Sequence, residues 1–262
     1  MSVEHRPDLV GEDLLALTRS LGRPERDLVI LAEGNTSERL TDGRLVVKAS
    51  GARMRDATAE DFVVAEVEPL AALIADPAAT QDDLTAALDA GVVDGRRRRG
   101  SIETLVHVAV HAVAPAAYPA GFVAHTHPTE VVGLLASTYA EDAFARAAYS
   151  DEAVVLGTPL FVPYAQPGLD LGRVYLQCLR EYADREGALP RLVLLANHGI
   201  VAIAPTADGA DGITEMAVKA AAVRRIAYSV GGLAPLSTEA VAKFVARGDV
   251  TERRSNITAG LL

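Results

Sequence analysis

The sequence predicts an α/β protein with three layers, in which helices cover both faces of a central mixed, mostly antiparallel sheet. Half of the 262 residues are apolar, which is enough for a continuous core. Several short apolar strand patterns follow one another across tight turns, and amphipathic helical patterns separate the others. Strands joined by tight turns run antiparallel, and helices between strands cover the faces of the sheet. No linker or repeat divides the chain, so we expect residues 1–262 to form one domain.

The first third of the chain combines a helix with a hairpin. Residues 8–21 form an amphipathic pattern that ends at Gly22, which predicts a helix. Residues 37–40 and 44–48 flank Thr41-Asp42-Gly43, and a glycine at this place suits the turn of a hairpin. Two further apolar runs predict strands, at residues 28–32 and, after a helical turn at residues 58–61, at residues 62–67.

Residues 69–100 are predicted to be an excursion from the domain. Two short helical patterns lie around residues 70–74 and 82–88, followed by the glycine- and arginine-rich run at residues 91–100. The four consecutive arginines, residues 96–99, are predicted to be a solvated loop. They could also form a local anion-binding site, because they lie directly before a candidate active-site segment.

The rest of the chain alternates helices and strands. Ser101 is a good helix N-cap, and the pattern that follows it continues to about Val113. The long helical pattern over residues 208–230 stops at Gly231-Gly232, as expected for a glycine cap. A shorter helix and a polar tail follow. The other helices are expected at residues 129–137 and 169–186, and the other strands at residues 121–127, near Val154, near Leu160 and as a pair over residues 191–204.

Composition excludes several classes of function. The net charge of −10 argues against a nucleic-acid-binding protein, which would need a basic face. No apolar run approaches the roughly 18 residues of a membrane span, and the charged N-terminus lacks the apolar core of a signal peptide. The single cysteine, Cys178, rules out an internal disulfide and suits a reducing compartment. We therefore expect a cytoplasmic protein.

Three histidines end two apolar strand patterns. His125 and His127 follow Phe122-Val123-Ala124, and His198 ends the run Leu192–Asn197. Residues i and i+2 of a strand point to the same face, so His125 and His127 can reach one point while a second strand brings in His198. Three imidazoles with an open fourth position are a ligand set of catalytic zinc. The pattern therefore predicts a metalloenzyme.

A rival metal site lies on the predicted helix after Ser101. Glu103, His107 and His111 are spaced by four residues and share one helical face. That face also carries the apolar stripe of a buried helix, so we interpret His107 and His111 as structural residues. Glu103 stands in the first turn, from which it can reach a site as a general base for proton abstraction next to a carbonyl. A metal would polarise that carbonyl and hold the resulting enediolate.

Two polar turns offer donors to an anion. They are Gly34-Asn35-Thr36-Ser37 and Ser50-Gly51, and the hydroxyl of Ser101 with the neighbouring helix-start amides could add to them. Each turn is weak evidence alone, since most such turns only reverse the chain. Their order along the chain together with Glu103, His125-Thr126-His127-Pro128 and Asn197-His198-Gly199 resembles the class II aldolase and adducin family, which includes fuculose-phosphate and rhamnulose-phosphate aldolases.

The resemblance implies a role for each motif. His125, His127 and His198 would be ligands of Zn²⁺, with Mn²⁺ or Co²⁺ as other candidates, and Glu103 would be the acid/base residue. Asn35, Thr36, Ser50, Gly51 and Ser101 would bind the substrate and its phosphate. The implied activity is reversible aldol cleavage of a sugar phosphate or hydroxy keto acid, and the implied fold is that of class II aldolases.

The chain departs from the family pattern at Ile102. Sugar-phosphate aldolases of this family usually have two consecutive small hydroxyl residues before the acid, so Ile102 removes one phosphate donor. The four arginines could compensate, or the substrate could be a different acid or an unphosphorylated ketose. A metal-dependent dehydratase or decarboxylase, or a non-catalytic adducin-like binding module, are the alternatives.

The resemblance also implies a homotetramer with active sites between subunits. In such aldolases a tyrosine from the neighbouring subunit helps to protonate the leaving group. Tyr149 is the corresponding residue here, in Ala147-Ala148-Tyr149-Ser150. Without the resemblance, Tyr149 would be interpreted as a partly buried anchor of a loop.

Overall fold

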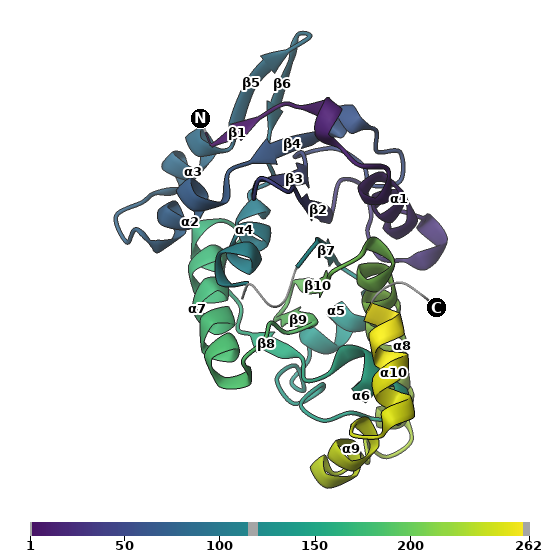
Figure 1. The fold of residues 1–262 in the computed structure, drawn as a ribbon. Helices are drawn as coiled ribbons and strands as arrows, with labels where there is room; N and C mark the ends of the chain where they lie inside the picture. Colours follow the sequence, from purple (N-terminus) through teal and green to yellow (C-terminus); the bar gives the residue numbers. More distant parts are fainter. Residues whose placement is uncertain (1, 115–119, 259–262) are drawn as a thin grey trace.

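A central sheet dominates the computed structural model, which describes residues 2–114 and 120–258. Eight strands of the described residues form this sheet in the order β1-β4-β3-β2-β7-β10-β9-β8 (Figure 1). Every neighbouring pair is antiparallel except β8 and β9, which are parallel. The predicted mixed, mostly antiparallel sheet is therefore confirmed. Its strands are β1 (Val3–Glu4), β2 (Asn35–Arg39), β3 (Leu45–Lys48), β4 (Phe62–Ala65), β7 (Phe122–Thr126), β8 (Leu160–Val162), β9 (Leu192–Leu195) and β10 (Gly199–Ala204).

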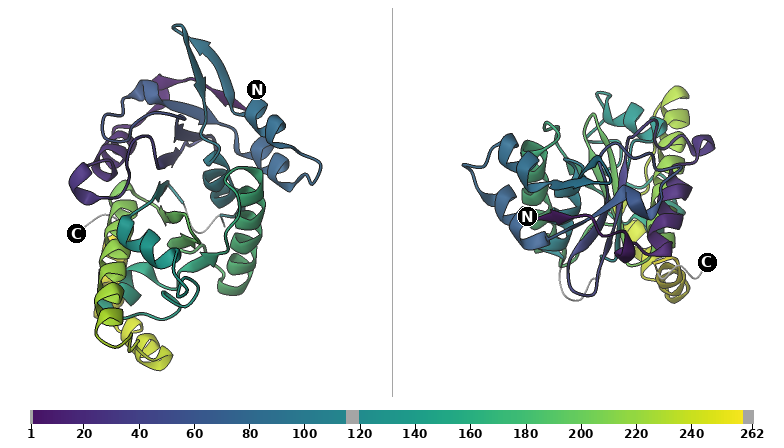
Figure 2. Two further views of the ribbon diagram at one scale, coloured as in Figure 1. Left: turned by 180° about the vertical axis from the view of Figure 1, so that it is seen from behind. Right: turned by 90° about the horizontal axis from the view of Figure 1, so that it is seen from above.

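Helices cover both faces of the sheet, as Figure 2 shows from above. One layer contains α2 (Val67–Ala75), α3 (Gln81–Ala87), α4 (Thr104–Val113) and α7 (Leu169–Glu186); the other contains α1 (Glu12–Leu21), α5 (Thr129–Leu135), α6 (Ser150–Leu156) and α8 (Ala207–Ser229). Alternate residues of β7 therefore enter different cores. Val123 packs with residues of α4 and α7, whereas Ala124 packs with residues of α1 and α8. This alternation decides which polar side chains share a face.

The segment at residues 91–100 is ordered as a β-hairpin, so the predicted loop is wrong. Strands β5 (Asp89–Val93) and β6 (Arg96–Arg99) pair with each other and project beyond the large sheet (Figure 1). Asp94 and Gly95 both have positive φ, as the two central residues of a type I′ turn require. The Asp-Gly pair was the sequence signal for this hairpin. Arg96, Arg97 and Arg99 are nevertheless exposed.

Two predicted strands are not formed. Residues 28–32 are a loop in which Leu31 has φ of 52° and is 76% exposed, and that left-handed conformation lies outside the β region of a regular strand. Val154 lies in α6, whose buried Glu152 forms an ion pair with Arg224 of α8. The buried pair explains why a polar residue interrupts this apolar segment.

Two helix starts and the C-terminal tail also differ from the prediction. The first long helix begins at Glu12 rather than at residue 8, because Pro7–Leu9 forms a separate 3-10 turn. The helix after Ser101 begins at Thr104. After the shorter helix α9 (Thr238–Val245), the predicted polar tail is helical over α10 (Gly248–Thr258), and residues 259–262 lie outside the described residues. Among the described residues, no helix combines the length and apolar character needed to cross a lipid bilayer.

Candidate metal centre

Three histidines meet at one edge of the large sheet. His125 belongs to β7, and His127 lies just beyond its end. His198 lies in the turn that joins β9 to β10. Strands β7 and β10 are antiparallel neighbours, with Thr126 opposite Ile200. The end of β7 therefore lies beside the turn that carries His198.

The donor atoms of this cluster converge on one point. The Nε2 atoms of His125 and His127 are 3.0 Å apart. The Nε2 atom of His198 is 2.9 Å from Oε1 of Glu103. One ligand atom from each of these four residues lies within 4.8 Å of the others. Zinc–nitrogen bonds of roughly 2.0–2.1 Å in a tetrahedron place two nitrogens about 3.4 Å apart, so a small outward movement of the imidazoles would admit the ion.

A hydrogen bond of His125 and the protonation state of His127 also suit a metal. The Nδ1 of His125 donates to the carbonyl oxygen of Ile200 at 2.9 Å, which leaves the Nε2 lone pair directed at the cluster. Burial lowers the pKa of His127 to about 3, so this imidazole is neutral at pH 7. The neutral imidazole is the form that binds a metal. The donor set therefore fits a divalent ion with nitrogen and oxygen ligands.

Glu103 completes the cluster from the start of α4. Its Oε2 accepts a hydrogen bond from Nδ2 of Asn35 at 2.8 Å and lies 3.4 Å from Nε2 of His125. Burial acts to raise the pKa of this carboxyl, but His125 and His198 overcome that effect and hold it well below its usual range. Glu103 is thus an ionised carboxylate in the centre of the site, able to act as a ligand or as a base.

The rival site on α4 does not form. His107 uses both ring nitrogens in hydrogen bonds, with Ser37 Oγ at 2.7 Å from Nδ1 and Asn35 Oδ1 at 2.5 Å from Nε2. Because the Asn35 amide nitrogen donates to Glu103, its oxygen must accept from Nε2 of His107. His107 therefore orients Asn35, which in turn orients Glu103. His111 is buried without a hydrogen-bond partner among the described residues.

The predicted anion-binding residues separate into two groups. An isolated bridge between Ala49 and Gly100 joins the segment that contains Ser50 and Gly51 to the segment that leads into Ser101. Gly51 has φ of 83°, which favours glycine. The Ser101 hydroxyl accepts from the Glu103 amide at 3.3 Å.

Thr36, unlike the other predicted anion-binding residues, is not brought to the site. It is buried on the opposite face of β2 from Asn35, where its hydroxyl lies 2.5 Å from that of Thr18 on α1. Successive residues of a strand point to opposite faces, so Asn35 and Thr36 cannot line the same pocket.

Lys48 is a site neighbour that the sequence did not reveal. It ends β3 with 1% of its surface exposed, and its ammonium donates to the carbonyl oxygen of Ala52 at 2.6 Å. Burial lowers the pKa of Lys48 to about 8, and Glu103 opposes that shift. This hydrogen bond thus stabilises the conformation of the loop that contains Ser50 and Gly51. A lysine at the end of an apolar strand, directly before a Ser-Gly turn, was the available signal.

Glu33 is a second carboxylate near the histidines. Its Oε2 lies 3.7 Å from Nδ1 of His127 and accepts from the amide of Ile30 at 3.0 Å. A cavity of about 420 Å³ begins here, with Val29, Glu33, His127 and His198 in its lining. This cavity gives the exposed side of the histidine cluster room for a small substrate.

Tyr149 lies at the N-cap of α6, and its contacts are with α8. Its hydroxyl donates to Sδ of Met216 at 3.0 Å, and the Lys219 ammonium lies 5.8 Å from its ring centroid. None of these contacts connects it with the histidine cluster of the same chain.

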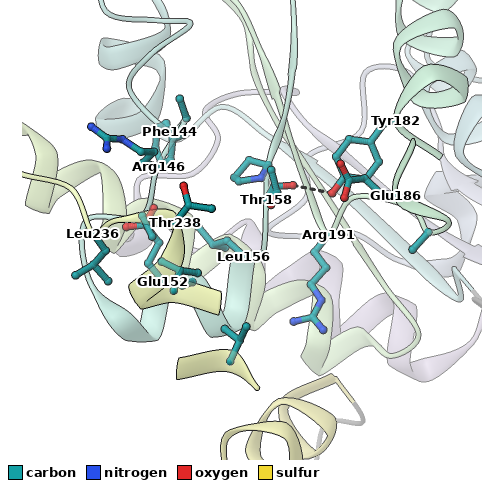
Figure 3. Close-up of a pocket in the computed structure, with 18 of the residues that line it drawn as sticks. Phe144, Arg146, Glu152, Leu156, Thr158, Tyr182, Glu186, Arg191, Leu236 and Thr238 are labelled. Atoms are coloured by element: carbon teal, nitrogen blue, oxygen red, sulfur yellow. Dashed lines mark hydrogen bonds between the residues drawn. The ribbon is translucent and has the colours of Figure 1, made fainter. Parts of the chain in front are cut away.

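A separate cavity of about 380 Å³ lies between α6, the end of α7 and α9 (Figure 3). Its polar side chains serve the fold: the Tyr182 hydroxyl donates to the carbonyl of Thr158, and Arg191 donates to the carbonyls of Val154 and Val155. None of the predicted site residues lines this cavity.

Comparisons with known proteins show the family to which the chain is similar. A family model described as the Class II Aldolase and Adducin N-terminal domain matches residues 12–224. The chain is 25% identical over 206 residues to a Bacillus subtilis (strain 168) protein described as the uncharacterized oxidoreductase YuxG. That match covers 76% of this chain and 27% of YuxG, so the chain spans about a quarter of the relative's length.

Solved structures share the fold. YgbL from Escherichia coli, described as a putative aldolase/epimerase/decarboxylase, has a TM-score of 0.64 and 20% identity over 89% of this chain and 96% of YgbL. The L-fuculose-1-phosphate aldolase from Thermus thermophilus has a TM-score of 0.56 and 20% identity over 86% of this chain and 100% of that chain.

Proposed function

The chain belongs to the class II aldolase and adducin family, and from this premise we propose that it is a zinc-dependent carbon–carbon lyase. Its reaction is the reversible aldol cleavage of a ketose or sugar acid into a small ketone-type fragment and an aldehyde. The observation that carries the proposal is the convergence of three imidazoles and one carboxylate within 4.8 Å. A binding module without catalysis has no need for that set.

The metal would be held by His125, His127 and His198. When bound, it would polarise the substrate carbonyl and stabilise the negative charge that develops on the carbonyl oxygen. Glu103 would carry the proton: in the condensation direction its carboxylate takes the proton from the carbon next to the carbonyl, and in cleavage it returns that proton. Asn35 would hold Oε2 of Glu103 by a hydrogen bond and so fix the direction of Oε1.

The cleavage step requires a second proton transfer. The hydroxyl on the carbon that becomes the aldehyde loses its proton as the carbon–carbon bond breaks, and the bonding electrons pass to the carbon next to the carbonyl. We assign the group that exchanges this proton to Tyr149 of a neighbouring subunit in a homotetramer. The position of Tyr149 on a contact with α8, outside its own chain's cluster, is compatible with that assignment.

A product assay tests the reaction type. Zinc-loaded protein is incubated with a panel of ketose 1-phosphates, unphosphorylated ketoses and hydroxy keto acids, and the products are identified by NMR. Aldol cleavage gives one aldehyde and one ketone fragment in equal amounts. Loss of water or of CO₂ with an intact remaining carbon chain would contradict cleavage and indicate a dehydratase or decarboxylase. Glu103→Gln protein serves as the control for contaminating enzymes.

A further inference from the structure

The imidazoles of the candidate metal centre are not supported equally. His125 lies inside β7 and is buried, and the carbonyl oxygen of Ile200 fixes its Nδ1. His127 lies beyond the end of β7, and 19% of its side chain is exposed. Its Nε2 faces His125 at 3.0 Å, so Nδ1 is the ring nitrogen left for an outside partner. A ligating imidazole is oriented through its second nitrogen, so this partner decides how firmly His127 can hold a metal.

Glu33 is the partner that the described part of the chain offers to this nitrogen. Its Oε2 lies 3.7 Å from Nδ1 of His127. That is an ion-pair distance, and a shift of about 0.8 Å would close it to the ~2.9 Å of an N–H···O hydrogen bond. A metal bound at Nε2 leaves the proton of the neutral imidazole on Nδ1. A donor would then face a carboxylate that can only accept.

A tight turn before β2 holds this carboxylate in place. The amide of Glu33 donates to the carbonyl oxygen of Ile30, and the amide of Ile30 donates to Oε2 of Glu33, both at 3.0 Å. The turn contains Leu31, whose positive φ is uncommon for a residue other than glycine. Since the Leu31 side chain is exposed, core packing does not account for this strain. Strained residues gather where a functional group must be held, here the Glu33 carboxylate.

The same loop is hydrogen-bonded to the histidine that it faces. The carbonyl oxygen of Leu28 accepts from the amide of His127 at 2.8 Å. The backbone of His127 and the carboxylate opposite its ring are therefore held by one segment. Glu33 itself is not among the four residues whose ligand atoms converge.

We propose that Glu33 is a positioning residue of the metal centre, which accepts a hydrogen bond from Nδ1 of His127 when Nε2 binds the ion. The carboxylate fixes the tautomer and the direction of this exposed imidazole and raises its basicity as a ligand. Glu33 acts through His127 and is not a ligand itself. The inference rests on the metal centre of the proposed function and does not depend on which reaction that centre catalyses.

Zinc affinity, measured by competition with a fluorescent chelator, tests the inference without turnover. Glu33→Ala should weaken zinc binding by about 10- to 100-fold, the usual effect of removing such a partner. Glu33→Gln keeps an oxygen that can accept from Ile30 and His127, so it should recover part of the loss. It also provides the comparison if the alanine variant does not fold.

Asp27→Asn is the matched control. Asp27 lines the same cavity as Glu33, and among the described residues it forms no ion pair with a histidine. Asparagine tolerates the positive φ of this position. The variant removes the same charge and should stay within about twofold of the wild-type affinity, because exposed charges are screened and contribute little.

A spectroscopic readout separates positioning from a structural effect on the loop. In zinc-loaded protein labelled with ¹⁵N-histidine, the Nδ1 proton of His127 should resonate downfield, as expected for a hydrogen bond to a carboxylate. Glu33→Ala should move this resonance upfield, whereas the Nδ1 proton of His125, which faces Ile200, should keep its position.

Three outcomes would overturn the role of Glu33. They are wild-type zinc affinity in both Glu33 variants, an equal loss of affinity in Asp27→Asn, and an unchanged Nδ1 resonance of His127. Wild-type protein that binds no zinc would refute the metal centre together with this inference. Wild-type protein that binds zinc but cleaves no ketose would refute the lyase alone.

Discussion

Lys48 gives a prediction whose size follows from its burial. Desolvation lowers its pKa from the ordinary value of 10.5 to about 8. Below pH 8 both the folded and the unfolded chain carry this proton, and the cost of burying the charge is present in full. Between pH 8 and 10.5 the unfolded chain holds more protons, so stability rises with pH. The pKa difference corresponds to a gain of about 3 kcal/mol.

The assay compares wild type with Lys48→Met, which keeps the shape of the chain but cannot titrate. The free energy of unfolding in urea is measured for both proteins at pH 7, 9 and 10.5. The contributions of titratable groups other than Lys48 cancel in the difference between the two proteins. We expect the wild type to gain up to about 3 kcal/mol relative to Lys48→Met across this range. Parallel stability curves, within about 0.5 kcal/mol, would refute the buried, charged environment assigned to Lys48.

Three further predictions concern the site. Glu103→Gln should lower turnover by about 10²–10⁴-fold, the usual contribution of a positioned acid/base, with metal content retained; an unchanged rate would assign proton transfer to another group. A Cβ at Gly199 would lie 2.6 Å from Cδ2 of His127. Gly199→Ala should therefore displace this imidazole and weaken metal binding by about 10- to 100-fold, as loss of ligand orientation does. An affinity for metal equal to that of the wild type would disprove this tight contact. Mixed oligomers of the inactive Glu103→Gln and Tyr149→Phe proteins should regain activity if each site uses both subunits; no recovery after verified subunit exchange would exclude Tyr149 from the chemistry.

Residue spacing within strands was sufficient to bring the histidines together. His125 and His127 share a face because of the two-residue period of a strand, and the glycine after His198 allows the close approach of β10 to β7. The hairpin of β2 and β3 was predicted for a similar reason, since its turn residues act locally. The sheet class followed from these short connections.

The two strands that were predicted but are not formed were mispredicted because of interactions that are distant in sequence. Residues 28–32 are apolar like a strand, but the carbonyl oxygen of Leu28 accepts from the amide of His127, which holds the segment as a loop. The helix α6 depends on Glu152, whose partner Arg224 is 72 residues away. A sequence pattern contains neither contact.

The polar side chains of the site show the same limit. Thr36 was grouped with Asn35 because both belong to one motif, although adjacent strand residues face opposite sides. The participation of His107 through Asn35, and the positions of Lys48 and Glu33, depend on which strands and loops lie side by side. These relationships become visible only in three dimensions.

Metal content of purified protein tests the central claim most directly. Wild type equilibrated with zinc and then freed of excess metal should hold one ion per chain, measured by mass spectrometry of the metal. His125→Ala, His127→Ala and His198→Ala should each lose most of it, whereas His107→Ala and His111→Ala, with folding verified by circular dichroism, should retain it. Full metal content in any of the first three variants would contradict the proposed centre.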